Sequence, residues 1–362
     1  MTGLNPEWLD KLGEDKQRFA LTAAGQKFLY QFLFKKGEHL FIIGNTGSGK
    51  TQKGYAIAHW MTYVKETIIW LDTGKNQEIV PLLKLGMPVR IICPKGTTVE
   101  FQEYNEDLKE WGPLQDPPEI VQVPEAGSAW WACRRDKINI FCFRNAFTDA
   151  NARWLWMGQL FETLATWTRK GSMPKIYPLS LFGDEAHWFN AGRRVSGDKV
   201  RSKLSEAVTE RALEIRGSGG RLIFFAQNYK NITPASRENL NCTLMCRNAH
   251  VTSAENSSLS KFNHYSSRWK PSEGLFVFSD GTIRPKTGPW TWPYYPMPKI
   301  RLRYVGDFDR PTKEQQQEQE IEQELMPDLG KYSGIMQDLQ GFEIPHTLSR
   351  WVDPLDGDLS NE

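Results

Sequence analysis

A glycine-rich loop between an apolar strand and a helix constrains the fold of this chain more than any other feature. The strand is predicted over His39–Ile43 and the helix over Lys50–Tyr63, and the loop between them reads Gly44-Asn45-Thr46-Gly47-Ser48-Gly49-Lys50-Thr51. Its glycines allow the backbone N–H groups of residues 45–50 to surround phosphate oxygens. Lys50 is expected to neutralise charge on the β- and γ-phosphates, and Thr51 to ligate Mg²⁺. The sequence therefore predicts a nucleoside triphosphate site, with ATP and Mg²⁺ as ligands.

Strands and helices alternate along most of the chain. The predicted strands after the loop are Thr67–Leu71, Val89–Cys93, Ile138–Phe143, Ile176–Phe182, Arg221–Ala226, Thr243–Cys246 and Leu275–Phe278, and the other predicted helices are Leu21–Lys36, Asn151–Lys170 and Lys199–Ile215. This alternation favours an α/β fold with a mostly parallel sheet and helices on both faces. Residues 86–137 contain six prolines and are interpreted as an irregular insertion whose fold the sequence does not predict.

The chain is expected to have three parts: an N-terminal helical segment (1–37), an α/β domain (38–306) and an acidic C-terminal tail (307–362). From Asp307 onward there are 14 acidic and 4 basic side chains, a balance of −10, so residues 1–306 carry +12. A basic body favours a polyanionic partner, and the alternative is surface charge that only keeps the protein soluble. The acidic tail is expected to compete for the same surface or to bind a protein partner.

Two features of the sequence bear on where the protein works. Residues 1–20 are polar and resemble no signal peptide, and no apolar run approaches the ~20 residues that a membrane span requires. The cysteines show no C-x-x-C pair and no nearby histidine group, which argues against a disulfide framework or a zinc site; they are Cys93, Cys133, Cys142, Cys242 and Cys246. We therefore expect a cytoplasmic protein, in the interior of the host cell if it is viral.

Two later strands end in polar residues suited to hydrolysis. An apolar run ending at Gly183 places Asp184 at the carboxyl end of a strand, where doubly wound sheets bind ligands. Asp184 is expected to hold the Mg²⁺ shell, and Glu185 to orient or deprotonate the attacking water. The strand Arg221–Ala226 leads into Gln227, which is interpreted as a sensor of the γ-phosphate or of the water; the alternative is an amide that only caps a strand end.

The order of these motifs resembles the FtsK/HerA superfamily of DNA-pumping ATPases, which includes chromosome translocases, conjugative coupling proteins and viral genome-packaging ATPases. The resemblance covers about residues 38–285, and Asn239–Arg247 and Gly274–Phe278 look like the later strands of the family. It departs from the family at Ala226, where threonine is usual, and at Asn228-Tyr229, where Arg-Pro-like residues are usual.

The resemblance implies a RecA-like P-loop fold and a motor that translocates or packages DNA as a homo-hexamer or other ring. In such rings an arginine of the neighbouring subunit reaches the γ-phosphate. The candidates here are Arg216 and Arg247, with Arg211 and Arg221 as further options.

The tetrad from Asp184 to His187 also spells the DEAH box of another helicase class, but the late Gln-rich, double-arginine motif of that class is missing from the sequence. His187 is therefore expected to contact the glutamate or the backbone. The alternative is an ordinary packed histidine.

Two basic segments are candidates for contact with DNA. The first, residues 190–201, combines flexible glycines with Arg193, Arg194, Lys199 and Arg201, a composition suited to backbone phosphates and not to base readout. The second, Lys261–Lys270, interleaves basic and aromatic side chains, and the aromatic ones are suited to stacking on single-stranded bases. For both segments an ordinary solvent-exposed loop is the alternative.

Two other functions stay open. One is an assembly ATPase without motor activity, as in filamentous-phage morphogenesis, although such proteins usually carry a transmembrane segment. The other is a nucleotide-dependent regulatory switch whose acidic tail recruits a partner. Glu185 and Gln227 argue mildly against a switch, because both are suited to turnover.

Overall fold

The computed structural model describes Phe32 and residues 38–63, 66–72, 77–143, 146–147, 149–170, 176–190, 199–240, 242–278 and 289–305. The chain divides into two units, residues 1–309 and 310–362, and all described residues belong to the first. Apart from Phe32, the predicted helix Leu21–Lys36 lies outside the described residues. The acidic tail, Arg193 and Arg194 also lie outside them.

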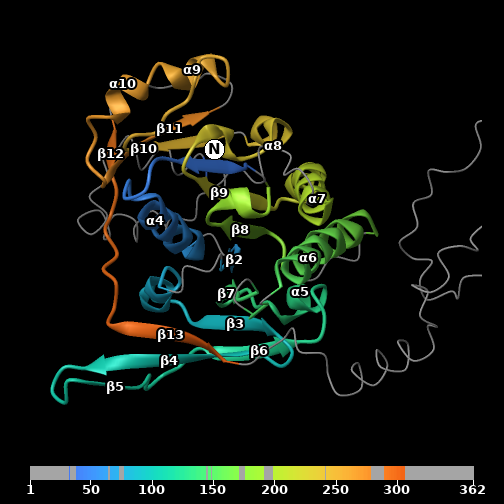
Figure 1. Ribbon diagram of the computed structural model, residues 1–362, viewed down its shortest axis with the longest axis vertical. Helices are drawn as coiled ribbons and strands as arrows, with labels where there is room; N and C mark the ends of the chain where they lie inside the picture. Colours follow the sequence, from blue (N-terminus) through green and yellow to red (C-terminus); the bar gives the residue numbers. More distant parts are fainter. Residues whose placement is uncertain are drawn as a thin grey trace, which may run out of the picture. The chain divides into compact units, whose positions relative to one another are not determined.

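A ten-stranded sheet of order β12-β11-β10-β1-β9-β8-β2-β7-β3-β6 forms the centre of this unit (Figure 1). Its strands are β1 Leu40–Ile43, β2 Thr67–Leu71, β3 Val89–Pro94, β6 Glu119–Val123, β7 Ile138–Phe141, β8 Leu179–Gly183, β9 Arg221–Ala226, β10 Cys242–Cys246, β11 Glu273–Phe278 and β12 Trp290–Thr291. The pairings from β10 through β6 are parallel, whereas β11 and β12 are added antiparallel. The predicted α/β fold with a mostly parallel sheet is confirmed.

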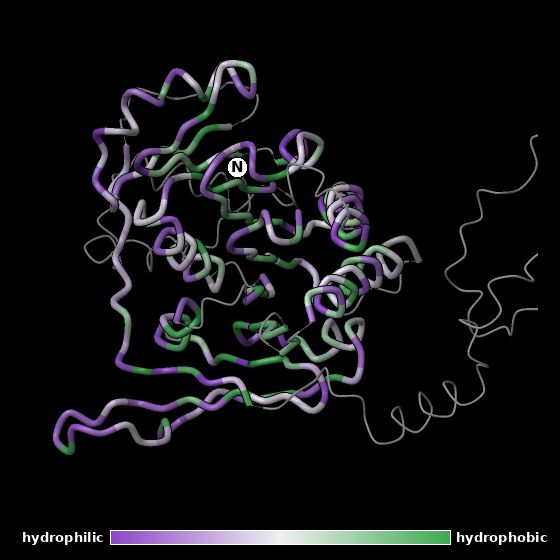
Figure 2. The backbone as a smooth tube through the Cα atoms, viewed as in Figure 1, coloured by the Kyte–Doolittle hydropathy of each residue, from purple (hydrophilic) through white to green (hydrophobic). Residues whose placement is uncertain are grey.

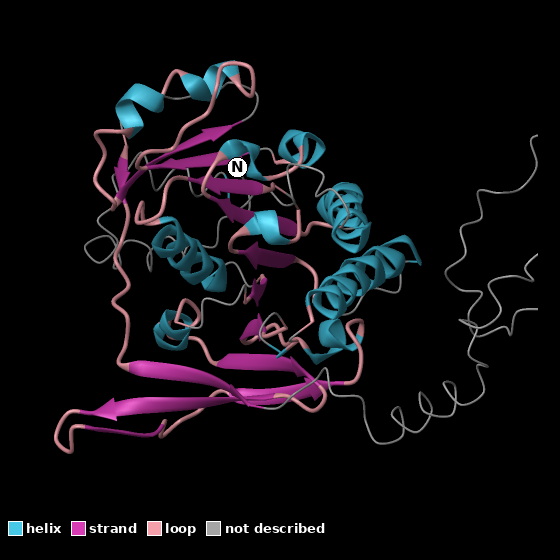
Figure 3. Cartoon of the chain, viewed as in Figure 1, coloured by secondary structure: helices cyan, strands magenta, loops and turns pink. Residues whose placement is uncertain are grey.

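Helices cover both faces of the sheet (Figure 3). Helix α4 (Lys50–Tyr63) lies on one face, and α6 (Ala150–Lys170), α7 (Lys199–Gly217) and α8 (Pro234–Asn239) lie on the other (Figure 1). The shorter helices and turns are η1 Val80–Lys84, α5 Ser128–Ala132, η3 Ala186–Trp188, η4 Tyr229–Asn231, α9 Ser257–Ser260 and α10 Asn263–Ser266. Two apolar clusters, one on each face, bury the central strands completely, which is why these strands read as continuous apolar runs.

The interpretation of residues 86–137 as an irregular insertion is wrong, because this segment has regular structure. Strands β3 and β6 extend the main sheet, and the hairpin of β4 (Thr98–Asn105) and β5 (Glu110–Pro113) joins β13 (Ile300–Val305) in a second, antiparallel sheet of order β13-β4-β5. The hairpin is mostly hydrophilic, unlike the central strands (Figure 2). Strands with so little apolar periodicity give a weak signal in the sequence.

A buried ion pair joins three strands at their amino ends. Arg221, the first residue of β9, is fully buried, and its Nε donates to both carboxylate oxygens of Glu66 at 2.9 and 3.0 Å. Nη1 of Arg221 donates to the Phe32 carbonyl at 2.7 Å, and the Ser180 hydroxyl on β8 donates to Glu66. These groups satisfy the buried charges, as burial of an ion pair requires.

Candidate active site

The glycine loop runs from the end of β1 to the first turn of α4, and its glycines are required by close approach. A Cβ on Gly44 would lie 2.6 Å from Ser48 Oγ and 2.8 Å from Cys246 Cβ. Gly49 has a φ of +76°, and a Cβ there would lie 2.4 Å from the Pro271 carbonyl oxygen. Larger side chains at these two positions would therefore distort the loop, as expected for a backbone cradle.

The ammonium of Lys50 lies within this loop. Its Nζ donates to the carbonyl oxygens of Gly44 at 2.7 Å and Asn45 at 3.1 Å, and the side chain is 8% exposed. The buried hydroxyl of Ser48 has no hydrogen-bond partner among the described residues. A positive charge and an unpartnered hydroxyl inside a glycine cradle fit a phosphate group.

Asp184 and Glu185 follow β8 directly and are 2% and 5% exposed. The N–H of Glu185 donates to Asp184 Oδ1 at 2.8 Å, and Glu185 has left-handed backbone angles, φ 46° and ψ 49°. A non-glycine residue in this region carries strain that is often found at functional sites.

The donor set fits Mg²⁺. Asp184 Oδ2 is buried without a hydrogen-bond partner among the described residues, and Thr51 lies in the first turn of α4. Mg²⁺ is usually held by one or two protein oxygens together with phosphate and water. No group of three or more His, Cys, Asp or Glu side chains suited to a metal occurs in the described part of the chain, and the predicted Thr51–Asp184 site needs none.

His187 contacts the glutamate, one of the two partners expected from the sequence. Its Nδ1 lies 3.3 Å from Glu185 Oε2, and the turn η3 holds the two residues in place. The carbonyl of His187 accepts a hydrogen bond of 2.7 Å from Arg201 Nη2. The guanidinium of Arg201 lies 5.4 Å from the ring centroid of Trp154 and 5.8 Å from that of Trp188. Arg201 therefore packs against the turn that carries Glu185, whereas Lys199 is exposed at the start of α7.

Strand β9 brings the predicted parts together. It pairs with β1 through Ile43 and Ala226, and with β8 through Gly183 and Phe224. The N–H of Gly44 also donates to the Ala226 carbonyl at 3.3 Å. The phosphate loop, the half-buried Gln227 and the Asp184-Glu185 pair thus follow three neighbouring parallel strands at one edge of the sheet.

The candidate arginines lie in different places. Arg247 is exposed directly after β10, and its carbonyl oxygen is 3.2 Å from the position of a Cβ on Gly44. Arg216 is exposed in the last turn of α7, which leads to the amino end of β9, at the edge opposite this chain's own loop. Arg211 forms ion pairs with Glu162, Glu210 and Glu214.

Arg221 is a correction to the sequence-based candidates. The sequence offered it as an arginine that reaches a neighbouring subunit, but its side chain is 0% exposed and bound to Glu66. The apolar residues of β9 gave no sign of this pairing, because Glu66 lies 155 positions earlier.

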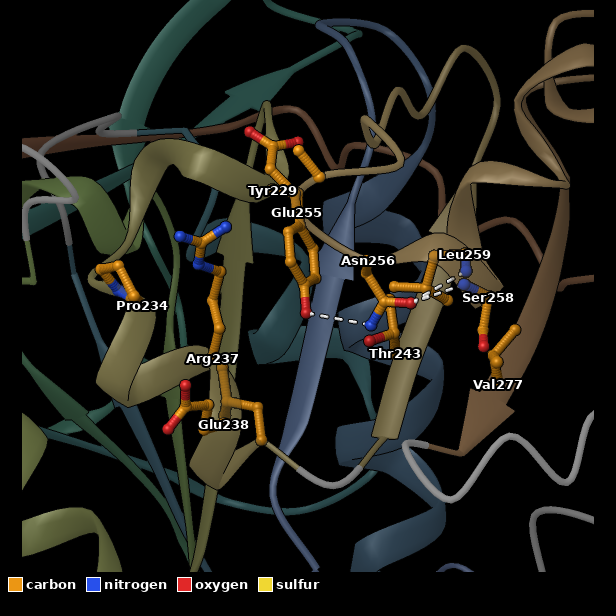
Figure 4. Close-up of a pocket in the computed structure, with 12 residues that line it drawn as sticks. Tyr229, Pro234, Arg237, Glu238, Thr243, Glu255, Asn256, Ser258, Leu259 and Val277 are labelled. Carbon is orange, nitrogen blue, oxygen red and sulfur yellow. Dashed lines mark hydrogen bonds between the residues drawn. The ribbon is translucent and has the colours of Figure 1, made fainter.

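The structure contains a cavity of about 420 Å³, which is lined by residues that follow Gln227 in the chain (Figure 4). The sequence did not predict this cavity. One side is formed by α8 and the other by residues 254–259. The Arg237 guanidinium lies 5.0 Å from the ring centroid of Tyr229, whose hydroxyl accepts a hydrogen bond from Asn256 Nδ2 at 3.4 Å. Tyr229, which lines the cavity, is two residues after Gln227 in the chain.

All five cysteines are buried thiols outside any disulfide. Among the described residues there is no helix with the length and apolarity needed to cross a membrane.

Comparison with known proteins gives distant structural similarity only. No family model matches the sequence, and no curated protein matches it. The chain is similar in structure to B204, the DNA-packaging ATPase of Sulfolobus turreted icosahedral virus, at 17% identity and a TM-score of 0.38, over 69% of this chain and 96% of that one. It is also similar to EccC (ATPases 2 and 3) of Thermomonospora curvata, at 11% identity and a TM-score of 0.41, over 74% and 39% of the two chains.

A third similar structure is the conjugation coupling protein TcpA of pCW3, at 15% identity and a TM-score of 0.36, over 72% of this chain and 61% of that one. Two of these three proteins are named as a DNA-packaging ATPase and a conjugation coupling protein. At such low identities and TM-scores, the similarity does not establish the function of this chain.

Proposed function

We propose that this protein hydrolyses ATP and uses the energy to move DNA, as a ring-forming translocase or packaging motor. The observation that carries the ATPase part is the convergence of Lys50, Asp184, Glu185 and Gln227 at the carboxyl edge of three neighbouring strands. These residues are spread over more than 170 positions of the chain, and their meeting at one edge has a simple chemical explanation in triphosphate hydrolysis.

Each residue has a distinct role in this proposal. The N–H groups of residues 45–50 and the ammonium of Lys50 bind the phosphates, and Thr51 and Asp184 hold Mg²⁺. Bound Mg²⁺ would offset the charge that develops on the phosphate oxygens. Glu185 accepts a proton from the attacking water or orients it, His187 fixes the carboxylate of Glu185, and Gln227 contacts the γ-phosphate or the water.

The proposal of DNA as the polymer rests on charge. Residues 1–306 carry a net charge of +12. The basic residues Arg193, Arg194 and Lys199 belong to the segment that follows the turn carrying Glu185. Contacts of this kind bind backbone phosphates without sequence preference. Arg201 is a weaker candidate than the other three because its guanidinium packs against the rings of Trp154 and Trp188.

In the proposed ring, Arg247 or Arg216 of each subunit serves the neighbouring site. Arg216 is exposed and lies away from its own loop, as an arginine that acts in trans must be. Arg247 lies beside its own loop and is also placed to act in cis.

The decisive experiment measures ATP turnover with and without double- and single-stranded DNA. Wild-type turnover is expected to rise with DNA, and Lys50→Ala and Glu185→Gln to abolish it; Glu100→Gln, an exposed glutamate on β4, serves as the matched control. Turnover that is indifferent to both kinds of DNA would refute the motor and favour an assembly ATPase. Tight ATP binding with slow turnover would favour a regulatory switch.

Assembly is tested with the Glu185→Gln variant, which is expected to bind ATP without hydrolysing it. Sedimentation in the presence of ATP, Mg²⁺ and DNA should then show a hexamer or another closed ring. A monomer under all these conditions would contradict the ring.

A further inference from the structure

A buried lysine outside the predicted site contacts the phosphate loop from the opposite side. Lys53 is 0% exposed and belongs to the second turn of α4. Its Nζ donates to the carbonyls of Ser48 at 3.3 Å, Gly49 at 3.4 Å and Pro271 at 2.8 Å. Burial lowers the pKa of Lys53, and Lys50 nearby acts in the same direction. A lysine is kept in such a place at a cost, so a specific role is expected.

The contacts of Lys53 bear on the direction of the loop's N–H groups. In a trans peptide the carbonyl and the following N–H point in opposite directions. The carbonyls of Ser48 and Gly49 share their peptide planes with the N–H groups of Gly49 and Lys50. The Lys53 ammonium holds both carbonyls, and the Lys53 N–H also donates to the Gly49 carbonyl at 3.1 Å. The two N–H groups therefore point away from Lys53.

The shortest of the three hydrogen bonds, at 2.8 Å, connects Lys53 to another segment of the chain. Pro271 follows the basic, aromatic tract Lys261–Lys270 and precedes β11. Its carbonyl faces Gly49 so closely that a Cβ there would lie 2.4 Å away, and a Cβ on Gly274 would lie 2.8 Å from Lys53 Cε. The first turn of α4, Lys53 and the end of the tract are therefore packed as one unit.

The tract itself presents polar and aromatic groups outward. Lys261, Arg268 and Lys270 are exposed, and Tyr265 is 59% exposed. The N–H of Lys270 donates to Glu273 Oε2 at 2.7 Å, which fixes the end of the tract next to Pro271. The contacts of Lys53 thus connect the loop to the end of an exposed basic surface.

We propose that Lys53 is a positioning residue that orients the N–H groups of the phosphate loop and couples nucleotide binding to the tract Lys261–Lys270. The inference rests on the proposed nucleotide site and adds to it a group that touches no nucleotide atom. It also assigns the tract a role as the surface that responds to the nucleotide.

The test compares two neighbouring positions of α4. Lys53→Met removes the ammonium and keeps most of the side-chain length. Gln52→Leu is the matched control, because Gln52 hydrogen-bonds to the backbone of Tyr295 at 2.7 and 3.0 Å, away from the carbonyls that Lys53 contacts. The readouts are the Kd for a fluorescent ATP analogue, KM and kcat for ATP, and hydrogen exchange of residues 261–273 with and without nucleotide.

Lys53→Met is expected to raise Kd and KM about tenfold with kcat changed less than about twofold, since a charged hydrogen-bond donor to the loop is lost. The nucleotide-dependent change in exchange of residues 261–273 should disappear. Gln52→Leu should keep the wild-type Kd and the wild-type exchange response. If Lys53→Met instead keeps the wild-type Kd and exchange response, and changes only the melting temperature as Gln52→Leu does, the proposal is overturned.

If Lys53→Met does not fold, Lys53→Gln replaces it. The glutamine amide is expected to donate to one of the carbonyls. A Kd above the wild-type value but less than tenfold higher therefore supports the proposal, whereas a wild-type Kd overturns it. Binding and exchange do not require hydrolysis. Failure of the proposed ATPase would therefore appear separately, as a wild type that binds ATP through Lys50 but does not turn it over.

Discussion

The imidazole Nδ1 of His187 lies 3.3 Å from Oε2 of Glu185. The contact orients the carboxylate that is proposed to act on water. His187→Asn is therefore expected to lower kcat about tenfold, a fraction of what a general base itself contributes, with Kd for ATP unchanged. The control is His250→Asn, at an exposed position outside the tract Lys261–Lys270. Equal kcat values for the two variants would show that His187 is an ordinary packed residue.

Arg201 and Lys199 are two positions apart in the sequence but are expected to differ in function. Arg201→Lys keeps the charge and loses the planar stacking on Trp154 and Trp188, so it should destabilise the fold by about 1 kcal/mol and leave DNA binding unchanged. Lys199→Ala should instead reduce the salt dependence of DNA binding by about one phosphate contact. The measurement is DNA affinity at several salt concentrations. A reduced slope for Arg201→Lys would restore Arg201 as a DNA contact.

Gly49 and Gly47 provide a matched pair in the loop. Both have positive φ, +76° and +74°, but a Cβ on Gly47 has no atom within 4 Å, whereas one on Gly49 meets the Pro271 carbonyl at 2.4 Å. Gly47→Ala should cost only the backbone strain, about 1–2 kcal/mol. Gly49→Ala should abolish nucleotide binding, which calorimetric titration with ATP measures. Similar ATP affinities for the two variants would contradict the close approach of Pro271.

The buried pair of Arg221 and Glu66 is expected to govern stability. Arg221→Met leaves the Glu66 carboxylate buried without its charge partner, and should lower the free energy of unfolding by about 3–5 kcal/mol. Adding Glu66→Leu should recover most of this loss, because neither charge then remains. Urea unfolding measures both effects. If Arg221→Met instead has normal stability and impaired ATP turnover, this arginine would act on the nucleotide of a neighbouring subunit.

His39 predicts a pH dependence of stability. Its Nε2 bonds to the Ala212 carbonyl at 2.8 Å, its Nδ1 accepts the Leu222 N–H at 3.0 Å, and burial lowers the pKa of His39 from 6.5 to about 4. The unfolded chain thus binds the proton more readily than the folded one. The stabilisation is complete above about pH 6.5 and is lost as pH falls toward 4, by about 3 kcal/mol in total.

The histidine's share of this effect is isolated with His39→Gln, which retains polar atoms but does not titrate. The difference in unfolding free energy between wild type and His39→Gln should shrink as pH falls from 7 to 4.5. His250→Gln, at an exposed position, should show a constant difference from wild type. A difference that is independent of pH for His39→Gln would show that His39 is not held neutral by the fold.

How far the sequence predicted the molecule depends on the range of the interactions involved. The helix Lys50–Tyr63 and the strands Thr67–Leu71 and Arg221–Ala226 have the predicted bounds, because apolar period and glycine placement are local signals. The hairpin β4–β5 was not predicted, since its partner β13 is nearly 200 positions later in the chain. The roles of Lys53 and Arg201 also depend on distant partners, Pro271 and Trp154, and no local pattern marks such pairs.

Strand β9 also acts as a spacer. Neighbouring strands are about 4.8 Å apart, so the strand before Gly44 and the strand before Asp184 are separated by about 10 Å, the width of two spacings. This separation is wide enough for the terminal phosphate and the water of the proposed reaction, and Gln227 follows the strand that lies between the two. In the proposed reaction the sheet itself would set the distance between the phosphate loop and Glu185, and a change in the pairing of β9 would alter that distance.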